Sequence, residues 1–177
     1  MVAADISRSA CFLMPKDYIV TGKPMIVSTV LGSCVAVCLF SSMPRVAAMC
    51  HCVLPWRGPA AAAEPVGYFV DETVQHLVAM TRKRGAAPGA TRAVLVGGAG
   101  MHAGTWIGPK GDSVGALNIR TARETLAAAG IPLVAEHVGG PAGRKVRFDT
   151  LTFDITLRLV SAAEDIVLQT ARPRHSA

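Results

Sequence analysis

The sequence LGSCVAVCLFSSMPRVAAMCHCVL, residues 31–54, contains two apolar runs separated by a short turn-forming segment. The runs Cys34–Phe40 and Val46–Leu54 are too short for a typical helix, which favours strands buried within a domain. Between them, Ser41–Pro44 carries two serines and a proline, residues that favour a turn. The stretch therefore predicts a hairpin of two buried strands.

Strand and helix patterns continue on both sides of this hairpin. Tyr18–Thr21 and Met25–Leu31 are β-rich runs separated by a Gly-Lys-Pro turn. Downstream of a proline-rich loop at 55–67, apolar spacing and glycine stops predict further elements. These are helices over 68–84 and 117–129, and strands over 93–96, 132–138, 145–148 and 153–159. The order predicts an α+β or layered α/β sandwich, with mixed or antiparallel sheets and two to three helices packed on them.

Length and composition indicate one domain. The chain has 177 residues, of which 51% are hydrophobic and 17% charged, enough apolar material for a sizeable core. We expect an N-terminal segment over 1–16, the folded domain over 17–160, and a basic C-terminal tail over 161–177.

Charge and targeting patterns restrict the function classes. The net charge of +6 favours an acidic partner, but the basic residues are dispersed and aromatics are only 5%, so nucleic-acid binding is poorly supported. No apolar run reaches the roughly 20 residues that span a bilayer, and residues 1–20 do not resemble a signal peptide. The protein is expected to be cytoplasmic, without membrane insertion. Five cysteines, an odd number, argue against a disulfide framework.

The hairpin predicts a cysteine beside a histidine. If the loop has four residues, Phe40 pairs with Arg45, and Cys34 then lies directly opposite His51. Opposed residues share a face, with Cβ atoms ~4.5–5.5 Å apart. This inference depends on the register, because a change in loop length changes the pairing.

A thiol beside an imidazole is suited to nucleophilic catalysis. The imidazole can take the thiol proton and return it to a leaving group. A hydroxyl on the preceding strand, from Ser28 or Thr29, could orient the imidazole. Backbone N–H groups of Ser33 and Cys34 are candidates for an oxyanion site.

Other interpretations compete with a catalytic thiol. Free cysteines are often core residues, and Cys38, Cys50 and Cys52 are expected to be so. A zinc site is disfavoured because strand alternation turns Cys50 and Cys52 away from His51. A redox role for Cys34 with Cys38 is disfavoured because residues four apart on a strand are ~13 Å apart.

Three features outside the hairpin are further candidates for functional or structural roles. The glycines at 97–100 allow close backbone approach but lack the spacing of a phosphate-binding motif. His102 in the following loop could contact a substrate. Glu136 and Arg144 could form a surface ion pair.

The sequence resembles the CheD family of chemoreceptor glutamine deamidases over residues 17–160. The resemblance lies in LGSCVAV at 31–37, His51 with Leu-Pro at 54–55, GGA at 97–99, Gly115 with Asn118, and EHVGG at 136–140 followed by Gly-Arg at 143–144 and Val146. It implies an α/β sandwich that hydrolyses receptor glutamine side chains to glutamate and releases ammonia, with receptor methylesterase activity as a further expectation.

The resemblance also assigns roles to individual residues. The family's nucleophile falls on Cys34 and its base on His51. Its third residue is a threonine six positions before the cysteine, where this chain has Ser28, with Thr29 next to it as the alternative. His137 occupies a position that is usually acidic.

Cofactors and partners follow from the same resemblance. Neither a metal nor an organic cofactor is expected. The implied partners are methyl-accepting chemoreceptors and a CheC-type phosphatase where one exists. The alternative to an enzyme is a non-catalytic docking module that binds receptors or that phosphatase.

Overall fold

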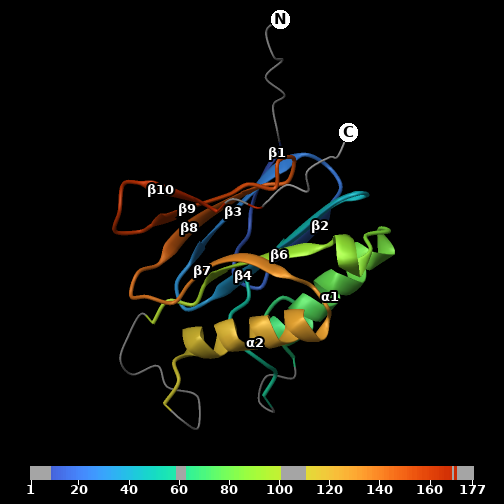
Figure 1. Cartoon of the computed structure of the whole chain (residues 1–177). Helices are drawn as coiled ribbons and strands as arrows, with labels where there is room; N and C mark the ends of the chain where they lie inside the picture. The colour runs from blue at the N-terminus through green and yellow to red at the C-terminus, as the bar shows by residue number, and fades with distance from the viewer. Residues whose placement is uncertain (1–8, 59–62, 101–110, 169, 171–177) are drawn as a thin grey trace, which may run out of the picture.

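A computed structural model describes residues 9–58, 63–100, 111–168 and 170. Within these residues, ten strands form two five-stranded sheets, and two α-helices lie beside one of them (Figure 1). The expected α+β sandwich is confirmed. His102 lies outside the described residues, so the expectation for it has no structural counterpart.

The first sheet has the strand order β1-β3-β8-β9-β10. Its strands are β1 (Ser9–Phe12), β3 (Met25–Leu31), β8 (Arg144–Asp149), β9 (Ile155–Leu159) and β10 (Asp165–Leu168). Strand β1 is parallel to β3, and the other neighbours are antiparallel. The outermost strands, β1 and β10, lie outside the 17–160 region in which the domain was expected.

The second sheet has the order β2-β5-β4-β6-β7. Its strands are β2 (Tyr18–Thr21), β5 (Arg45–Cys50), β4 (Val35–Ser42), β6 (Arg92–Gly97) and β7 (Leu133–Val138). The predicted strands Tyr18–Thr21 and Met25–Leu31 match β2 and β3 in both bounds. The helices are α1 (Val70–Lys83) and α2 (Val114–Ala128), with a short 3₁₀ turn at Pro88–Ala90.

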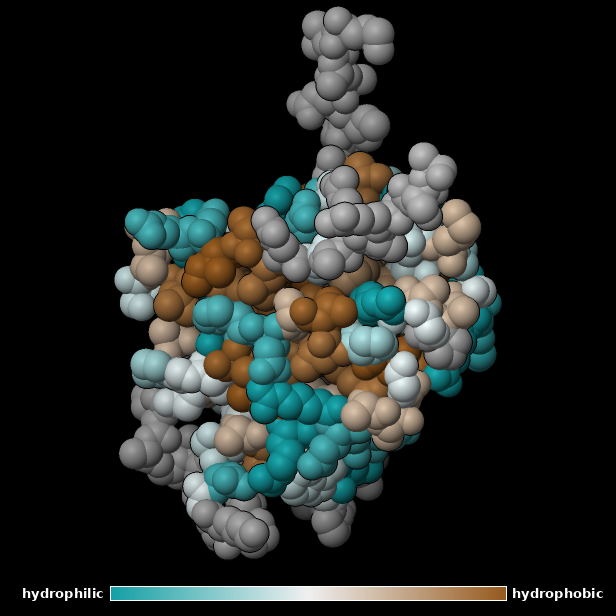
Figure 2. Space-filling view, viewed as in Figure 1, coloured by the Kyte–Doolittle hydropathy of each residue, from teal (hydrophilic) through white to brown (hydrophobic). Residues whose placement is uncertain are grey.

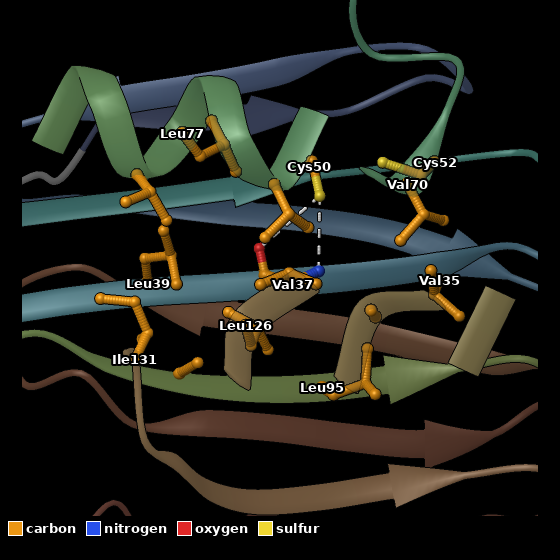
Figure 3. Packing of buried hydrophobic residues seen from close by; sticks show 14 of the residues in the cluster. Val35, Val37, Leu39, Cys50, Cys52, Val70, Leu77, Leu95, Leu126 and Ile131 are labelled. Carbon is orange, nitrogen blue, oxygen red and sulfur yellow. Dashed lines mark hydrogen bonds between the residues drawn. The ribbon is translucent and has the colours of Figure 1, made fainter. Parts of the chain in front are cut away.

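The central strand β4 separates two hydrophobic cores, which explains its unbroken apolar sequence. Val35, Val37 and Leu39 face the helices and pack with Leu77 of α1 and Leu126 of α2 (Figure 3). The alternate residues of β4, from Ala36 to Phe40, face the first sheet and form the core between the sheets. Because both faces are covered, the strand does not alternate between apolar and polar residues.

The hairpin register differs from the prediction. Strands β4 and β5 pair Ser42 with Arg45, so the loop has two residues rather than four. The paired positions therefore sum to 87 instead of 85, and the isolated bridge between Val35 and Cys52 continues the same register. Cys34 is not directly opposite His51. The predicted pairing is displaced by two residues, and because side chains alternate with a period of two, each one still lies on the predicted face.

Candidate functional site

Cys34 lies in the loop Gly32–Cys34, which joins β3 to β4. The carbonyl groups of this loop are fixed by the end of β6. The Ala99 N–H donates to the Gly32 carbonyl at 2.8 Å, and the Gly98 N–H donates to the Cys34 carbonyl at 2.8 Å. A β-carbon at Gly97 would lie 2.3 Å from the Cys34 oxygen, and Gly97 has φ +115°. The glycines at 97–98 therefore permit the backbone approach that holds the cysteine loop.

Asn118 of α2 fixes the remaining carbonyl of the loop. Its side chain is fully buried, and its Nδ2 donates to the Ser33 carbonyl and to the Val53 carbonyl, both at 3.0 Å. Its Oδ1 has no hydrogen-bond partner within the described residues. Gly115 lets α2 approach, because a β-carbon there would lie 2.5 Å from the Gly98 oxygen. One side chain thus links the cysteine loop to the segment that follows His51.

His51 comes directly after β5 and is held through its backbone by the segment before β2. Its N–H donates to the Asp17 carbonyl at 2.9 Å, and its carbonyl accepts from the Lys16 N–H at 2.9 Å. The residue is 3% exposed. Its ring Nδ1 lies 2.8 Å from Oγ1 of Thr29 on β3.

The hydroxyl of Thr29 determines the tautomer of His51. Thr29 Oγ1 donates its single hydrogen to the Leu13 carbonyl at 2.7 Å. The contact with the ring therefore requires Nδ1–H of His51 as the donor and the hydroxyl oxygen as the acceptor. In the neutral imidazole this leaves Nε2 as the proton acceptor.

The structure separates the two candidate hydroxyls. Thr29 is buried between the sheets and contacts His51, whereas Ser28 Oγ donates to the Cys11 carbonyl at 3.5 Å. Consecutive strand residues point to opposite faces. Ser28, the position that corresponds to the family's threonine, therefore lies on the outer face of the first sheet, away from the imidazole.

Cys34 and His51 share the face between the two sheets. In the observed register, extension of the ladder places Ala36 opposite His51 and makes Cys34 its diagonal neighbour. Such neighbours are ~7–8 Å apart, within reach of a long side chain. Cys34 also packs against the core between the sheets and is only half-buried. The structure thus gathers Cys34, His51 and Thr29 at one end of that core.

Burial sets the resting charge state of the pair. It raises the pKa of the Cys34 thiol, although the residue's own backbone N–H partly opposes the effect. Burial also lowers the pKa of His51, and the Leu13 carbonyl and the Asp17 carboxylate partly oppose it. Both shifts favour the uncharged forms, so at neutral pH the resting site holds a thiol and a neutral imidazole.

The other cysteines behave as core residues. Cys38, Cys50 and Cys52 are buried, and no cysteine of the described chain forms a disulfide. Sγ of Cys50 accepts a hydrogen bond from the Val37 N–H at 3.4 Å (Figure 3). Cys50 and Cys52 face the helices, opposite to His51.

The expected ion pair between Glu136 and Arg144 does not form. Glu136 instead pairs with Arg123 of α2, with Oε1 and Nη2 2.6 Å apart. Arg144 is 3% exposed, and its Nε donates to Nδ1 of His137 at 2.8 Å. Burial and the neighbouring guanidinium lower the pKa of His137. The imidazole therefore accepts a hydrogen bond from the buried arginine, which gives a structural role to the residue that departs from the family pattern.

Two parts of the site were not predicted. The segment Leu13–Asp17, which contacts both Thr29 and His51, was assigned mainly to the N-terminal segment because no motif marks it. Asn118 was noted only as part of a family pattern, without a role. A single polar residue between apolar helix positions, with Gly115 before it, was the available signal.

The fold and the site define a class of protein: a two-sheet α+β sandwich that gathers a cysteine thiol, an imidazole and a hydroxyl at one end of its inter-sheet core. The chain belongs to the CheD family, because the family model described as CheD chemotactic sensory transduction matches residues 53–159.

Curated relatives extend this match over most of the chain. The "Probable chemoreceptor glutamine deamidase CheD 2" of Geobacter sulfurreducens is 37% identical, covering 86% of this chain and 91% of the relative. The protein named "Probable chemoreceptor glutamine deamidase CheD" of Rhodospirillum rubrum is 38% identical, covering 88% of each chain. "Chemoreceptor glutamine deamidase CheD" of Thermotoga maritima is 33% identical, covering 86% of this chain and 94% of the relative.

One solved structure aligns weakly with this chain. The crystal structure of the hypothetical protein YfiH from Bacillus licheniformis aligns with a TM-score of 0.43 and 16% identity, covering 68% of this chain and 49% of that one. Within the described residues, neither helix has the length and hydrophobicity needed to cross a membrane.

Proposed function

We propose that this protein is a chemoreceptor glutamine deamidase in which Cys34 is the nucleophile, His51 the general base and Thr29 the residue that orients His51. The observation that carries the proposal is the hydrogen bond between Thr29 and His51, which leaves Nε2 free to accept a proton. Membership in the CheD family supports the choice of substrate, because the relatives are named for this activity.

The reaction begins with proton transfer from Cys34 Sγ to His51 Nε2. The sulfur then attacks the side-chain carbonyl carbon of a receptor glutamine and forms a tetrahedral intermediate. When this intermediate collapses, the C–N bond breaks, the imidazolium donates its proton to the nitrogen, and ammonia leaves. The product of this half-reaction is a thioester between Cys34 and the receptor side chain.

Water completes the cycle. His51 Nε2 takes a proton from the water, whose oxygen attacks the thioester carbon. The C–S bond then breaks, Cys34 recovers the proton from His51, and the receptor keeps a glutamate side chain. The same second step would hydrolyse a thioester formed from a glutamate methyl ester after methanol leaves, so methylesterase activity belongs to the proposal.

Backbone N–H groups of Ser33 and Cys34 serve as the oxyanion site. The three carbonyls of the loop already accept hydrogen bonds, and these fix the orientation of its peptide groups. Within the described part of the chain, these two N–H groups donate to no other residue. Preorganised donors of this kind stabilise the charge that develops on the carbonyl oxygen.

The proposed partners are the cytoplasmic helices of methyl-accepting chemoreceptors, so the protein acts in the cytoplasm. A CheC-type phosphatase is a second proposed partner where the cell has one. The proposed chemistry needs no metal or organic cofactor, because each proton and bond is accounted for by Cys34, His51 and water.

The test follows glutamine-to-glutamate conversion in a receptor fragment by peptide mass spectrometry. Cys34→Ala and His51→Ala should abolish conversion, while Cys11→Ala, which removes a half-buried thiol from β1, should retain it. Receptor binding without conversion by the unaltered protein would favour the docking module. Activity that survives in folded Cys34→Ala would overturn the proposed nucleophile.

A further inference from the structure

The outer face of the first sheet has no helix over it in the described structure. Helices α1 and α2 both pack on the second sheet, whose outer apolar residues they bury (Figure 1). The solvent side of α2 is hydrophilic, whereas hydrophobic side chains are visible over strands of the first sheet (Figure 2). Exposed apolar area on a sheet face is a common feature of interaction sites.

This face contains a hollow of about 330 Å³ over β3, β8 and β9. Its apolar rim includes Phe12 of β1 and Val30 of β3, which are 53% and 44% exposed. Val167 of β10, which pairs with Thr156 in the hollow, is 56% exposed. Apolar side chains thus surround the hollow on both sides.

Basic side chains occupy the middle of the hollow. Lys145 and Arg147 are both exposed on β8, two positions apart, so they point to the same face. Lys145 pairs across the sheet with Val30 on one side and with Arg158 on the other. Like charges directly opposite each other destabilise a sheet, so folding alone does not favour this arrangement.

Within the part of the chain that the structure describes, one of these cations forms an ion pair and the other two do not. Arg158 forms an ion pair with Asp165, with Nε and Oδ1 2.7 Å apart. Among the described residues, Lys145 and Arg147 form no ion pair. Two unpaired cations between exposed apolar residues complement a partner that carries both acidic and apolar groups.

An amphipathic helix with acidic residues is the partner that fits best. Packing of a helix on a sheet already covers the other sheet of this protein. A second copy of the chain is disfavoured because each copy carries a net charge of +6. Nucleic acid is disfavoured because two free cations and one aromatic ring provide few phosphate or stacking contacts.

The hollow is close to the proposed nucleophile along the chain. Val30 is four residues before Cys34, a separation of at most ~14 Å at 3.3–3.6 Å per residue. We infer that the outer face of the first sheet, centred on Lys145 and Arg147, docks an acidic amphipathic helix of the receptor substrate. This inference rests on the proposed function, since it assigns the surface by which the substrate is held beside the site.

The test compares two charge reversals of equal size. The variant Lys145→Glu/Arg147→Glu changes the hollow, and Lys83→Glu/Arg84→Glu changes an exposed basic pair at the end of α1. Both pairs are placed in a Cys34→Ser background, which prevents turnover. Binding to a cytoplasmic receptor fragment from the same genome is measured by fluorescence anisotropy, with circular dichroism as the check of folding.

The hollow variant should bind the fragment at least tenfold more weakly, while the α1 variant should bind within twofold of the parent. Equal losses in both variants would overturn the inference, since they would reflect net charge alone. Undiminished binding by the hollow variant, or no binding by the parent, would also overturn it. Loss of binding to anionic vesicles but not to the fragment would assign the face to a membrane instead.

Turnover with the wild-type thiol separates this inference from the proposed function. A short glutamine peptide without acidic residues tests the chemistry alone. The hollow variant should keep its kcat/KM for this peptide and lose at least tenfold for the receptor fragment. If neither substrate is hydrolysed by the unaltered protein, yet fragment binding depends on Lys145 and Arg147, the proposed activity fails and the docking surface stands.

Discussion

The hydroxyl of Thr29 accepts a hydrogen bond from Nδ1–H of His51 while donating its own hydrogen to the Leu13 carbonyl. These two hydrogen bonds connect Leu13, just after β1, through Thr29 of β3 to His51, just after β5. It fixes both the orientation of the imidazole and the nitrogen that carries its proton. Because the hydroxyl has only one hydrogen, the Leu13 carbonyl is as much a part of this relationship as Thr29.

Replacement of Thr29 by valine should therefore impair catalysis more than folding. Thr29→Val keeps the shape but removes the hydroxyl oxygen that accepts from Nδ1–H of His51, so the alternative tautomer becomes more accessible. We expect kcat to fall by about 10-fold to 100-fold, equivalent to about 1.4–2.8 kcal/mol in the barrier. Thr29→Ser keeps the hydroxyl and should retain most of the activity.

The neighbouring hydroxyl provides the control for this experiment. Ser28→Ala removes a group on the opposite face of β3 and should leave kcat within about twofold. Steady-state kinetics with a receptor fragment would compare the three variants. A larger loss of kcat in Ser28→Ala than in Thr29→Val would show that the contact between Thr29 and His51 is not the one that catalysis requires.

The position of Thr29 shows what the sequence could and could not determine. Alternation along β3 implies that only one of Ser28 and Thr29 can face the core, but the choice depends on which face β3 buries. That choice is made by the packing of β3 against the second sheet, which has no local signal. Thr29 is buried and Ser28 is not, so tertiary contacts decide between two adjacent hydroxyls.

The hairpin illustrates a second limit. Its strands were predictable because apolar runs of this length match buried strands, but the loop length was not. Serine is common in turns, yet Ser41 and Ser42 belong to β4 and pair with β5. Only Met43 and Pro44 remain in the turn. The register therefore moved by two residues. Since side chains repeat every two residues along a strand, Cys34 and His51 stayed on one face.

The ends of the first sheet were missed for a related reason. Strands β1 and β10 are four residues each, and their burial patterns are mostly exposed. Short edge strands lack the alternation that marks a half-buried strand. Each exists through pairing with a longer neighbour: β1 pairs with β3, beyond β2 in the chain, and β10 pairs with β9, the strand just before it. The contact of Leu13 with the site follows from the pairing of β1 with β3, whereas that of Asp17 continues the pairing of β2 with β5.

Asn118 should be required for both stability and the geometry of the cysteine loop. Asn118→Leu preserves volume but removes both donors, leaving the Ser33 and Val53 carbonyls without them. We expect the free energy of unfolding in urea to fall by about 2–4 kcal/mol. In the fraction that remains folded at low temperature, kcat should fall while KM changes little, because the loop carries the proposed oxyanion donors.

An isosteric substitution tests the same position through its pH dependence. Asn118→Asp keeps the shape but replaces the donor with an acceptor that faces two carbonyl oxygens. It should also reduce kcat, and a buried carboxylate should lose less stability at low pH, where it is protonated. Wild-type stability and kcat in both variants would refute a positioning role for Asn118.

Gly97 should not accept a side chain. A β-carbon there would lie 2.3 Å from the Cys34 oxygen, and the residue has φ +115°. Gly97→Ala must therefore displace the cysteine loop, with an expected loss of about 1–3 kcal/mol in unfolding free energy and a loss of activity. Gly100→Ala is the matched control, because nothing lies within 4 Å of its added carbon. Thermal and urea unfolding of both variants would measure the contrast, and equal stability would contradict it.

The resting protonation state of Cys34 can be measured by its alkylation. Burial raises the pKa of this thiol above the ordinary value, and burial lowers the pKa of His51, so proton transfer between them is unfavourable before substrate binds. The thiolate is the species that reacts with iodoacetamide. As pH rises, the alkylation rate should increase through a midpoint above the usual thiol pKa of about 8.5.

Peptide mass spectrometry would locate the label, with Cys34→Ala giving the background from other cysteines. A rate that is already maximal near pH 6.5 would indicate a preformed thiolate–imidazolium pair, and deprotonation would then precede substrate binding rather than accompany the attack on the glutamine.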